Sequence, residues 1–146
     1  MKVSQIMTKE VHIIEPTQTL KECAEVMNKK RANGLVVVDD GKVVGVITKA
    51  DIFKAILPRY PDIVEDERHM TDLEYIEERA HKLYEVKVKE IMGTPPITVS
   101  SDAPVVRAGS QMILRRVKQL PVLDKNKLAG IITLTDIITY LLKKIK

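Results

Sequence analysis

The chain has 146 residues, of which 45% are hydrophobic and 30% charged, and its formal net charge is +4. This length gives one domain of ordinary size or two very small ones, and the composition is that of a folded globular protein. A single cysteine, Cys23, excludes an internal disulfide and a multi-cysteine metal site. The longest apolar runs are strand-sized and the N-terminus has no signal-peptide pattern, so we expect a cytoplasmic protein.

The chain contains an internal sequence repeat. Residues 3–57 align with residues 88–142 without a gap, and both copies end alike, in GVITKAD and GIITLTD. A unit of this size cannot bury both of its faces alone. We therefore expect two similar units that pack on each other about a pseudo-twofold axis.

Each copy opens with a short apolar segment followed by a helix. The apolar segments are 11–14 and 97–99, and the helices are expected to begin near Thr17 and Asp102. In the first copy, a capping box formed by Thr19 is an alternative start. Apolar residues at helical spacing then predict one buried helix face.

Two β-branched runs and a second helix complete each copy. In the first copy the runs are 35–39 and 43–48, and they are joined by Asp40-Gly41, a favoured two-residue hairpin turn. The closing helices are predicted at 49–57 and 134–142. Each copy is thus a β-α-β-β-α unit of an α/β protein.

Residues 58–87 have no counterpart in the repeat. They contain five basic and nine acidic residues, a net charge of −4 in a chain that is basic overall. Thr71 and Glu74 offer a capping box, and apolar residues follow at helical spacing, which predicts an amphipathic connector helix. The chain therefore divides into repeat 1 (1–57), the connector (58–87) and repeat 2 (88–146).

The motifs of both repeats, taken together, resemble a tandem pair of cystathionine β-synthase (CBS) domains. They are I-M-T or I-M-G at the opening, VVVDD or PVLDK at the first long strand, and G-[VI]-I-T-x-x-D before the last helix. The resemblance implies a regulatory module that binds adenosine-containing ligands, such as AMP, ADP, ATP or S-adenosylmethionine, between the repeats. It also implies a homodimer in which two pairs form a flat disc of four repeats.

The T-x-x-D segments have a physical reason to bind such a ligand. Thr48 and Thr133 end a strand where a helix begins, so free backbone N–H groups and the positive end of the helix dipole favour a phosphate. Asp51 and Asp136, one turn later, can accept hydrogen bonds from both hydroxyls of a ribose. The alternative is that these residues only cap their helices.

The resemblance assigns the remaining site residues to two clefts, carried over position by position. We rank the Asp136 cleft first, because Thr8 and Thr135 add hydroxyl groups where the other cleft has Gly93 and Ala50. The Asp136 cleft would hold Thr133, Thr135 and Asp136 against Thr8, Ile13, Ala32, Asn33 and Gly34. The Asp51 cleft would hold Thr48 and Asp51 against Thr98, Val117, Lys118 and Gln119.

Other chemistry-bearing residues favour structural roles. His69, Asp72 and His81 lack metal-ligand spacing and indicate a solvated helix face, and Cys23 shares the apolar stripe of the first helix. No nucleophile–base motif is present, so we expect neither an enzyme nor a cofactor. The basic clusters 29–31 and 115–116 are expected to end their helices, and a phosphate or RNA contact is the alternative.

Two other functions stay open. A pI near 9.1 suggests a nucleic-acid-binding regulator, although the chain has few aromatic residues for stacking. A structural dimerisation module with vestigial pockets is the second alternative. The apolar last helices, with Phe53 and Leu141 among their residues, predict a homodimer in either case, and an unidentified regulated protein is a further partner.

Overall fold

A computed structural model describes residues 1–57 and 72–145. Repeat 1 consists of the 3₁₀ helix η1 (Val3–Gln5), strand β1 (Ile13–Ile14), helix α1 (Leu20–Lys30), strands β2 (Gly34–Asp39) and β3 (Lys42–Thr48), and helix α2 (Lys49–Ile56). Repeat 2 consists of α5 (Val88–Ile91), β4 (Val99–Ser100), α6 (Val105–Arg115), β5 (Gln119–Asp124), β6 (Lys127–Thr133) and α7 (Leu134–Ile145). The predicted β-α-β-β-α order is confirmed in both repeats.

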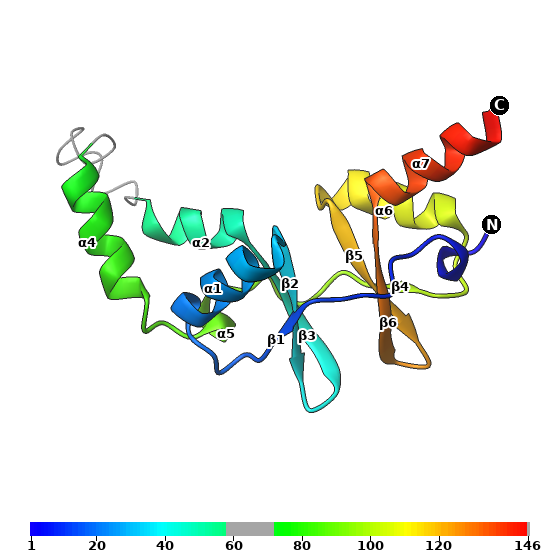
Figure 1. The fold of residues 1–146 in the computed structure, drawn as a ribbon. Coiled ribbons are helices and arrows are strands. Elements are labelled where there is room, and N and C mark those ends of the chain that lie inside the picture. The colour runs from blue at the N-terminus through cyan, green and yellow to red at the C-terminus, as the bar shows by residue number, and fades with distance from the viewer. Residues whose placement is uncertain (58–71, 146) are drawn as a thin grey trace.

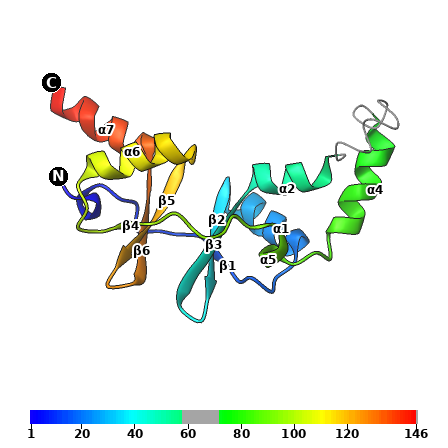
Figure 2. The same ribbon diagram turned by 180° about the vertical axis from the view of Figure 1, so that it is seen from behind.

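Each repeat builds one three-stranded sheet. In repeat 1 the order is β1-β2-β3, with β1 parallel to β2 and β2 antiparallel to β3, and repeat 2 repeats this order as β4-β5-β6. The predicted hairpin turns are present: Asp40 and Gly41 have φ of 51° and 79°, and Lys125 and Asn126 have 51° and 66°. Positive φ at both turn residues matches the twist of the strands. Figures 1 and 2 show the sheets side by side, with both hairpins pointing the same way.

The first helix of each repeat begins differently from the other. Thr19 caps α1, since its side chain accepts a hydrogen bond from the Glu22 amide at 3.1 Å, so the alternative start is confirmed and Thr17 is not the cap. A hydrogen bond from the side chain of Gln18 is the main cause of a lowered pKa at Glu22. Helix α6 has Pro104 at its N-cap, two residues beyond the predicted start.

Both of these helices end on an arginine, as the basic clusters predicted. Arg31 and Arg116 are the C-caps, with left-handed φ values of 54° and 56°, and basic residues occupy the last turns. Cations at this end of a helix complement its dipole.

The two repeats exchange their opening segments, which the sequence did not predict. Val3 is fully buried in the core of repeat 2, and its amide donates to the Ala103 carbonyl at 2.9 Å. Val88 is equally buried in the core of repeat 1, and its amide donates to the Gln18 carbonyl at 2.8 Å. The crossing is visible in Figure 1, where the chain from the N-terminus leaves the side of repeat 2 to reach β1. Each repeat therefore needs the other to complete its core.

Two glycines make room for the crossing segments. A Cβ atom on Gly45 would lie 2.6 Å from the Met92 sulfur and 2.9 Å from the Gly93 carbonyl oxygen. One on Gly130 would lie 2.7 Å from the Thr8 carbonyl oxygen. Such distances are below ordinary van der Waals contact, so both positions require glycine for a close approach of backbones.

The described part of the connector forms helix α4 (Leu73–Leu83). Its N-cap is Asp72, whose side chain accepts a hydrogen bond from the Tyr75 amide at 3.3 Å. Thr71, which the predicted capping box pairs with Glu74, lies outside the described residues. Arg79 joins α4 to α2, because its Nε donates to the Ile56 carbonyl at 2.8 Å. Residues 58–71, including His69, lie outside the described residues.

None of the helices within residues 1–57 and 72–145 has the length and apolar character needed to span a bilayer. Cys23 is fully buried in the core of repeat 1, as predicted. Burial raises the pKa of its thiol from an ordinary value of 9.0 to about 11.

Candidate ligand-binding cleft

The T-x-x-D segments form the same reciprocal cap in both repeats. Thr48 Oγ1 accepts a hydrogen bond from the Asp51 amide at 3.1 Å, and Asp51 Oδ2 accepts one from the Thr48 amide at 2.9 Å. Thr133 and Asp136 make the same two bonds at the same two distances. The capping role is thus present at both sites, and it occupies only one oxygen of each carboxylate. The second oxygen is where the sites differ.

At Asp136, the second carboxylate oxygen already has a partner within the chain. Thr8 Oγ1 donates to Asp136 Oδ1 over 3.4 Å, a long hydrogen bond that links repeat 1 to repeat 2. Gly93 occupies the equivalent position opposite Asp51 and has no hydroxyl group. Among the described residues, Asp51 Oδ1 accepts no hydrogen bond, which leaves it for a ligand hydroxyl.

A cavity of about 730 Å³ lies beside Asp51, between the two repeats. This volume is in the range of small-molecule sites. Repeat 1 contributes the end of β3 and the start of α2, and repeat 2 contributes residues 93–97 and 116–119. Both helix caps border the cavity, since Thr133 and Thr135 also line it.

Nine of the predicted site residues border this cavity. Five are the core of the predicted Asp51 cleft: Thr48, Asp51, Val117, Lys118 and Gln119. The other four were assigned to the Asp136 cleft: Asn33, Gly34, Thr133 and Thr135. Thr8, Ile13, Ala32, Thr98 and Asp136 do not line it, and their role in a second cleft stays a prediction.

The pseudo-twofold axis explains why one cavity takes residues from both predicted sets. Gly34 and Gln119 occupy equivalent positions in the two repeats, and a Cβ on Gly34 would lie 2.6 Å from Gln119 Nε2. The strands β2 and β5 thus begin against each other at the centre of the cleft. Residues near this centre can therefore border either of the two predicted clefts.

Sequence reasoning missed several lining residues. The segment 94–97, with a cis peptide bond between Thr94 and Pro95, borders the cavity, as do Lys49 and Lys54. Arg116 also lines it, in one of the two basic clusters for which a phosphate contact was the alternative. A signal was available at the lysines, because Lys49 lies within the T-x-x-D motif that was predicted to bind phosphate and Lys54 follows it by one helical turn.

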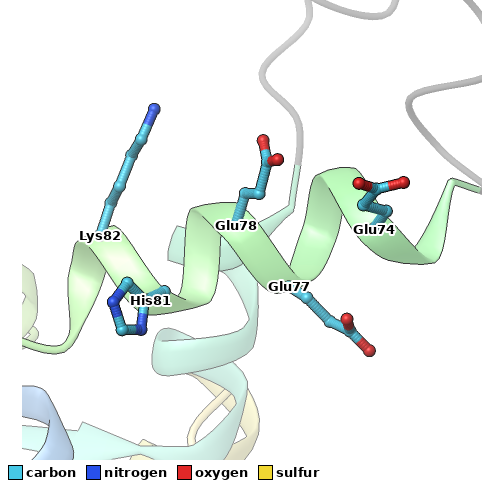
Figure 3. A pocket seen from close by; sticks show the side chains of 5 residues that line it. All are labelled: Glu74, Glu77, Glu78, His81 and Lys82. Atoms are coloured by element: carbon cyan, nitrogen blue, oxygen red, sulfur yellow. The ribbon is translucent and has the colours of Figure 1, made fainter.

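The exposed face of α4 carries a second, shallow pocket that is lined by Glu74, Glu77, Glu78, His81 and Lys82. Figure 3 shows these side chains pointing away from the helix in different directions rather than toward one point. Within the described residues, no group of three or more His, Cys, Asp or Glu side chains is arranged to hold a metal ion. This helix face matches the solvated face predicted around His81.

Comparison with known proteins connects this geometry to a family. Residues 3–58 and 88–143 each match the family model of the CBS domain. An uncharacterised protein of Methanocaldococcus jannaschii is 34% identical over 141 residues, which cover 96% of this chain and 32% of that protein. The chain thus spans about a third of the length of this curated relative.

Two similar solved structures cover nearly the whole chain. The CBS domain pair of protein MJ0100, in complex with 5'-methylthioadenosine and S-adenosyl-L-methionine, has a TM-score of 0.72 and 25% identity, covering 99% of this chain and 98% of its own. CBSX2 in complex with AMP has a TM-score of 0.75 and 23% identity, with the same coverage. At this identity the second likeness shows the fold alone.

Proposed function

The chain belongs to the CBS domain family as a tandem pair of such domains, and from this premise we propose that it is a non-catalytic regulatory module that binds an adenosine-containing ligand between its repeats. The single observation that carries the proposal is the cavity beside Asp51. Its walls come from both repeats, so a ligand there contacts both and can change their relative arrangement.

The chemistry around the cavity suits a nucleotide. The start of α2 brings the positive end of a helix dipole to the cavity, which favours phosphate, while the amides of Lys49 and Asp51 already donate to the Asn33 carbonyl and to Thr48 Oγ1. The free Oδ1 of Asp51 is an acceptor for ribose hydroxyls, and Val46, Val117 and Ile97 offer apolar surface for a base. The CBS pair at 25% identity holds two adenosine-derived ligands, which supports this chemical class.

The cavity changes the order in which we rank the two clefts. Sequence analysis placed the Asp136 cleft first because of its additional hydroxyl groups. In the structure one of those hydroxyls, that of Thr8, is directed to the Asp136 carboxylate itself, and the described cavity lies beside Asp51. We therefore propose Asp51 as the principal ribose-binding carboxylate.

Isothermal titration calorimetry of the full chain against AMP, ADP, ATP, S-adenosylmethionine and methylthioadenosine tests the proposal. The expected result is saturable binding of at least one of these compounds that is weakened by Asp51→Ala. Lys42→Ala, on the β2–β3 hairpin outside the cavity lining, is the control. No binding by any of the five compounds would reject the proposed function and leave the dimerisation module with vestigial pockets as the better account.

The proposal includes assembly as a homodimer through the helical side of repeat 2. Helix α7 exposes an apolar stripe with i, i+3, i+4, i+7 spacing, and the neighbouring α6 exposes a second stripe. The exposed side chains are Val106, Ile113 and Leu114 on α6, and Ile138, Leu141, Leu142 and Ile145 on α7. Figures 1 and 2 show α2 and α7 on the same side of the molecule, so one partner can cover both helices. A patch of this kind is typical of a protein interface.

Light scattering and sedimentation measure the mass of the full chain at micromolar concentration. We expect a dimer, and a wild-type monomer at that concentration would reject this part of the proposal.

A further inference from the structure

Four cationic side chains line the cavity beside Asp51. Lys49 and Lys54 come from α2 of repeat 1, and Arg116 and Lys118 come from the end of α6 and the approach to β5 in repeat 2. Asp51 is the one carboxylate among the described residues that line the cavity. Both walls are therefore positively charged, and the positive charge exceeds the negative charge.

None of these cations forms an ion pair within the part of the chain that the structure describes. Across residues 1–57 and 72–145 the single ion pair joins Lys2 to Asp102, at 3.6 Å and far along the chain from α2. Like charges gathered around one concave space repel each other, and the space concentrates an anion that enters it. An anion that enters the cavity reduces this repulsion.

The equivalent positions of the Asp136 cleft lack most of this charge. Leu134 and Thr139 stand where Lys49 and Lys54 stand, and Asn33 stands where Lys118 stands. Only the position equivalent to Arg116 is also basic in the other repeat, where it is Arg31. The main-chain arrangement is the same in both repeats, so these substitutions, rather than the fold, give the two clefts different charge.

From this contrast we infer that the Asp51 cleft binds a nucleotide with a chain of two or three phosphates, in preference to a monophosphate or an uncharged adenosyl compound. The inference rests on the proposed function and specifies its ligand. A single phosphate at the start of α2 neutralises one wall, whereas a phosphate chain extends from the ribose at Asp51 to cations of both walls. Charge-assisted contacts of lysine and arginine to phosphate are among the stronger hydrogen bonds in proteins. Methylthioadenosine brings no anion, and the sulfonium of S-adenosylmethionine adds positive charge.

Calorimetry with adenosine, AMP, ADP and ATP, without divalent cations, measures the effect of phosphate number on affinity. We expect the affinity to rise along the series, with ATP binding about tenfold or more tightly than AMP. The advantage of ATP is expected to shrink as salt rises from about 0.01 M to 0.15 M, because the side chains of all four cations are exposed to solvent.

Variants that copy the other cleft test which residues give the preference. Lys49→Leu with Lys54→Thr introduces the residues found at positions 134 and 139, and it is expected to weaken ATP about tenfold or more while changing adenosine less than about twofold. Lys42→Leu with Lys127→Thr makes the same change of net charge on the two hairpins, outside the cavity lining, and is expected to leave both affinities unchanged. Thermal unfolding of each variant checks that the fold is retained.

The outcomes separate the two proposals. Equal affinity for adenosine, AMP and ATP, or a double variant that weakens adenosine as much as ATP, overturns the polyphosphate preference while the proposed function stands. Equal losses from the control variant overturn it too, since they show an effect of net charge alone. If none of the four compounds binds, the proposed function itself fails, and the inference fails with it.

Discussion

The two repeats are nearly the same in their interiors and clearly different on their surfaces. Strands β2 and β5 have the same burial pattern, as do β3 and β6, and the register of the first pair, Gly34 opposite Thr48, returns as Gln119 opposite Thr133. Met27 and Met112 are both fully buried at equivalent positions. Packing of the core constrains these positions, because a core is close-packed and tolerates few changes of volume.

The two repeats differ at exposed positions, where core packing does not constrain the residue type. Lys21, Asn28 and Lys29 on the exposed side of α1 correspond to Val106, Ile113 and Leu114 on α6. The cleft edges differ as well, by the lysines on α2 and by Gly93 in the place of Thr8. The two repeats therefore share one scaffold, and the residues that distinguish them lie on the exposed helix faces and at the cleft edges.

The largest effect is expected at the exposed stripe of α7. Leu141→Glu places a charge in the proposed dimer contact and should raise the dissociation constant more than about 100-fold, because an unpaired buried charge costs several kcal/mol. Phe53→Glu, on α2 of repeat 1, should do less, since the exposed apolar stripes of the proposed contact lie on α6 and α7 of repeat 2. Sedimentation velocity over a concentration series measures both. Equal effects would show that the two repeats contribute alike to the interface.

A slightly smaller effect, on ligand affinity, is expected when the carboxylates of Asp51 and Asp136 are removed. Asp51→Ala should weaken nucleotide binding by about 1.5–3 kcal/mol, the range for hydrogen bonds to a charged group. Asp136→Ala should cost less ligand affinity at the Asp51 cleft, because Asp136 does not line the described cavity. Calorimetry of the two variants in parallel measures the difference. A larger loss of affinity in Asp136→Ala than in Asp51→Ala would place the Asp136 cleft first again, as the hydroxyl groups of Thr8 and Thr135 suggested.

Replacing the glycine that faces each crossing segment should destabilise the protein equally in the two repeats. Gly45→Ala and Gly130→Ala each force a Cβ atom against a backbone oxygen of the crossing segment, at 2.9 Å and 2.7 Å. Each should lower the free energy of unfolding by about 1–3 kcal/mol. Gly41→Ala, in a turn where a Cβ atom meets nothing within 4 Å but φ is +79°, is the control for backbone strain alone. Urea denaturation measures all three, and a loss at only one of the two buried glycines would show that the crossings are not equivalent.

The smallest effect is expected at Cys23, whose equivalent in repeat 2 is the buried Ala108. Cys23→Ala should cost about 1 kcal/mol, since one buried heavy atom is lost. The folded thiol has a raised pKa, so its contribution to stability is complete below pH 9 and is lost as the pH rises toward about 11. The alkaline part of the stability profile should therefore be flatter in the variant. An unchanged alkaline slope would mean that other groups cause it.

Much of this fold could be predicted from the sequence, because periodicity and turn residues report local structure. The 85-residue offset, the Asp40-Gly41 turn and the T-x-x-D caps were sufficient to place the hairpins and the closing helices. The exchange of opening segments could not be predicted in this way. Val3 and Val88 are apolar in either arrangement, and only tertiary packing decides which core receives them.

The candidate cleft was predictable in part. Thr48 and Asp51 follow from the T-x-x-D motif and Lys118 from the family resemblance, but the close approach of Gly34 to Gln119 depends on how the two sheets meet. Nor could residue types alone show that Thr8 is directed to Asp136. The lysines on α2 were visible in the sequence, but only the structure shows that they line the same cavity as Arg116 and Lys118.

Hydrogen exchange during an ATP titration tests whether one ligand contacts both repeats at the Asp51 cleft. We expect peptides covering residues 48–52 of repeat 1 and 116–120 of repeat 2 to gain protection together, with the same midpoint. Asp51→Ala should shift both midpoints to higher concentration. Protection confined to one repeat, or to α4 at residues 73–83, would show that no ligand contacts both repeats there.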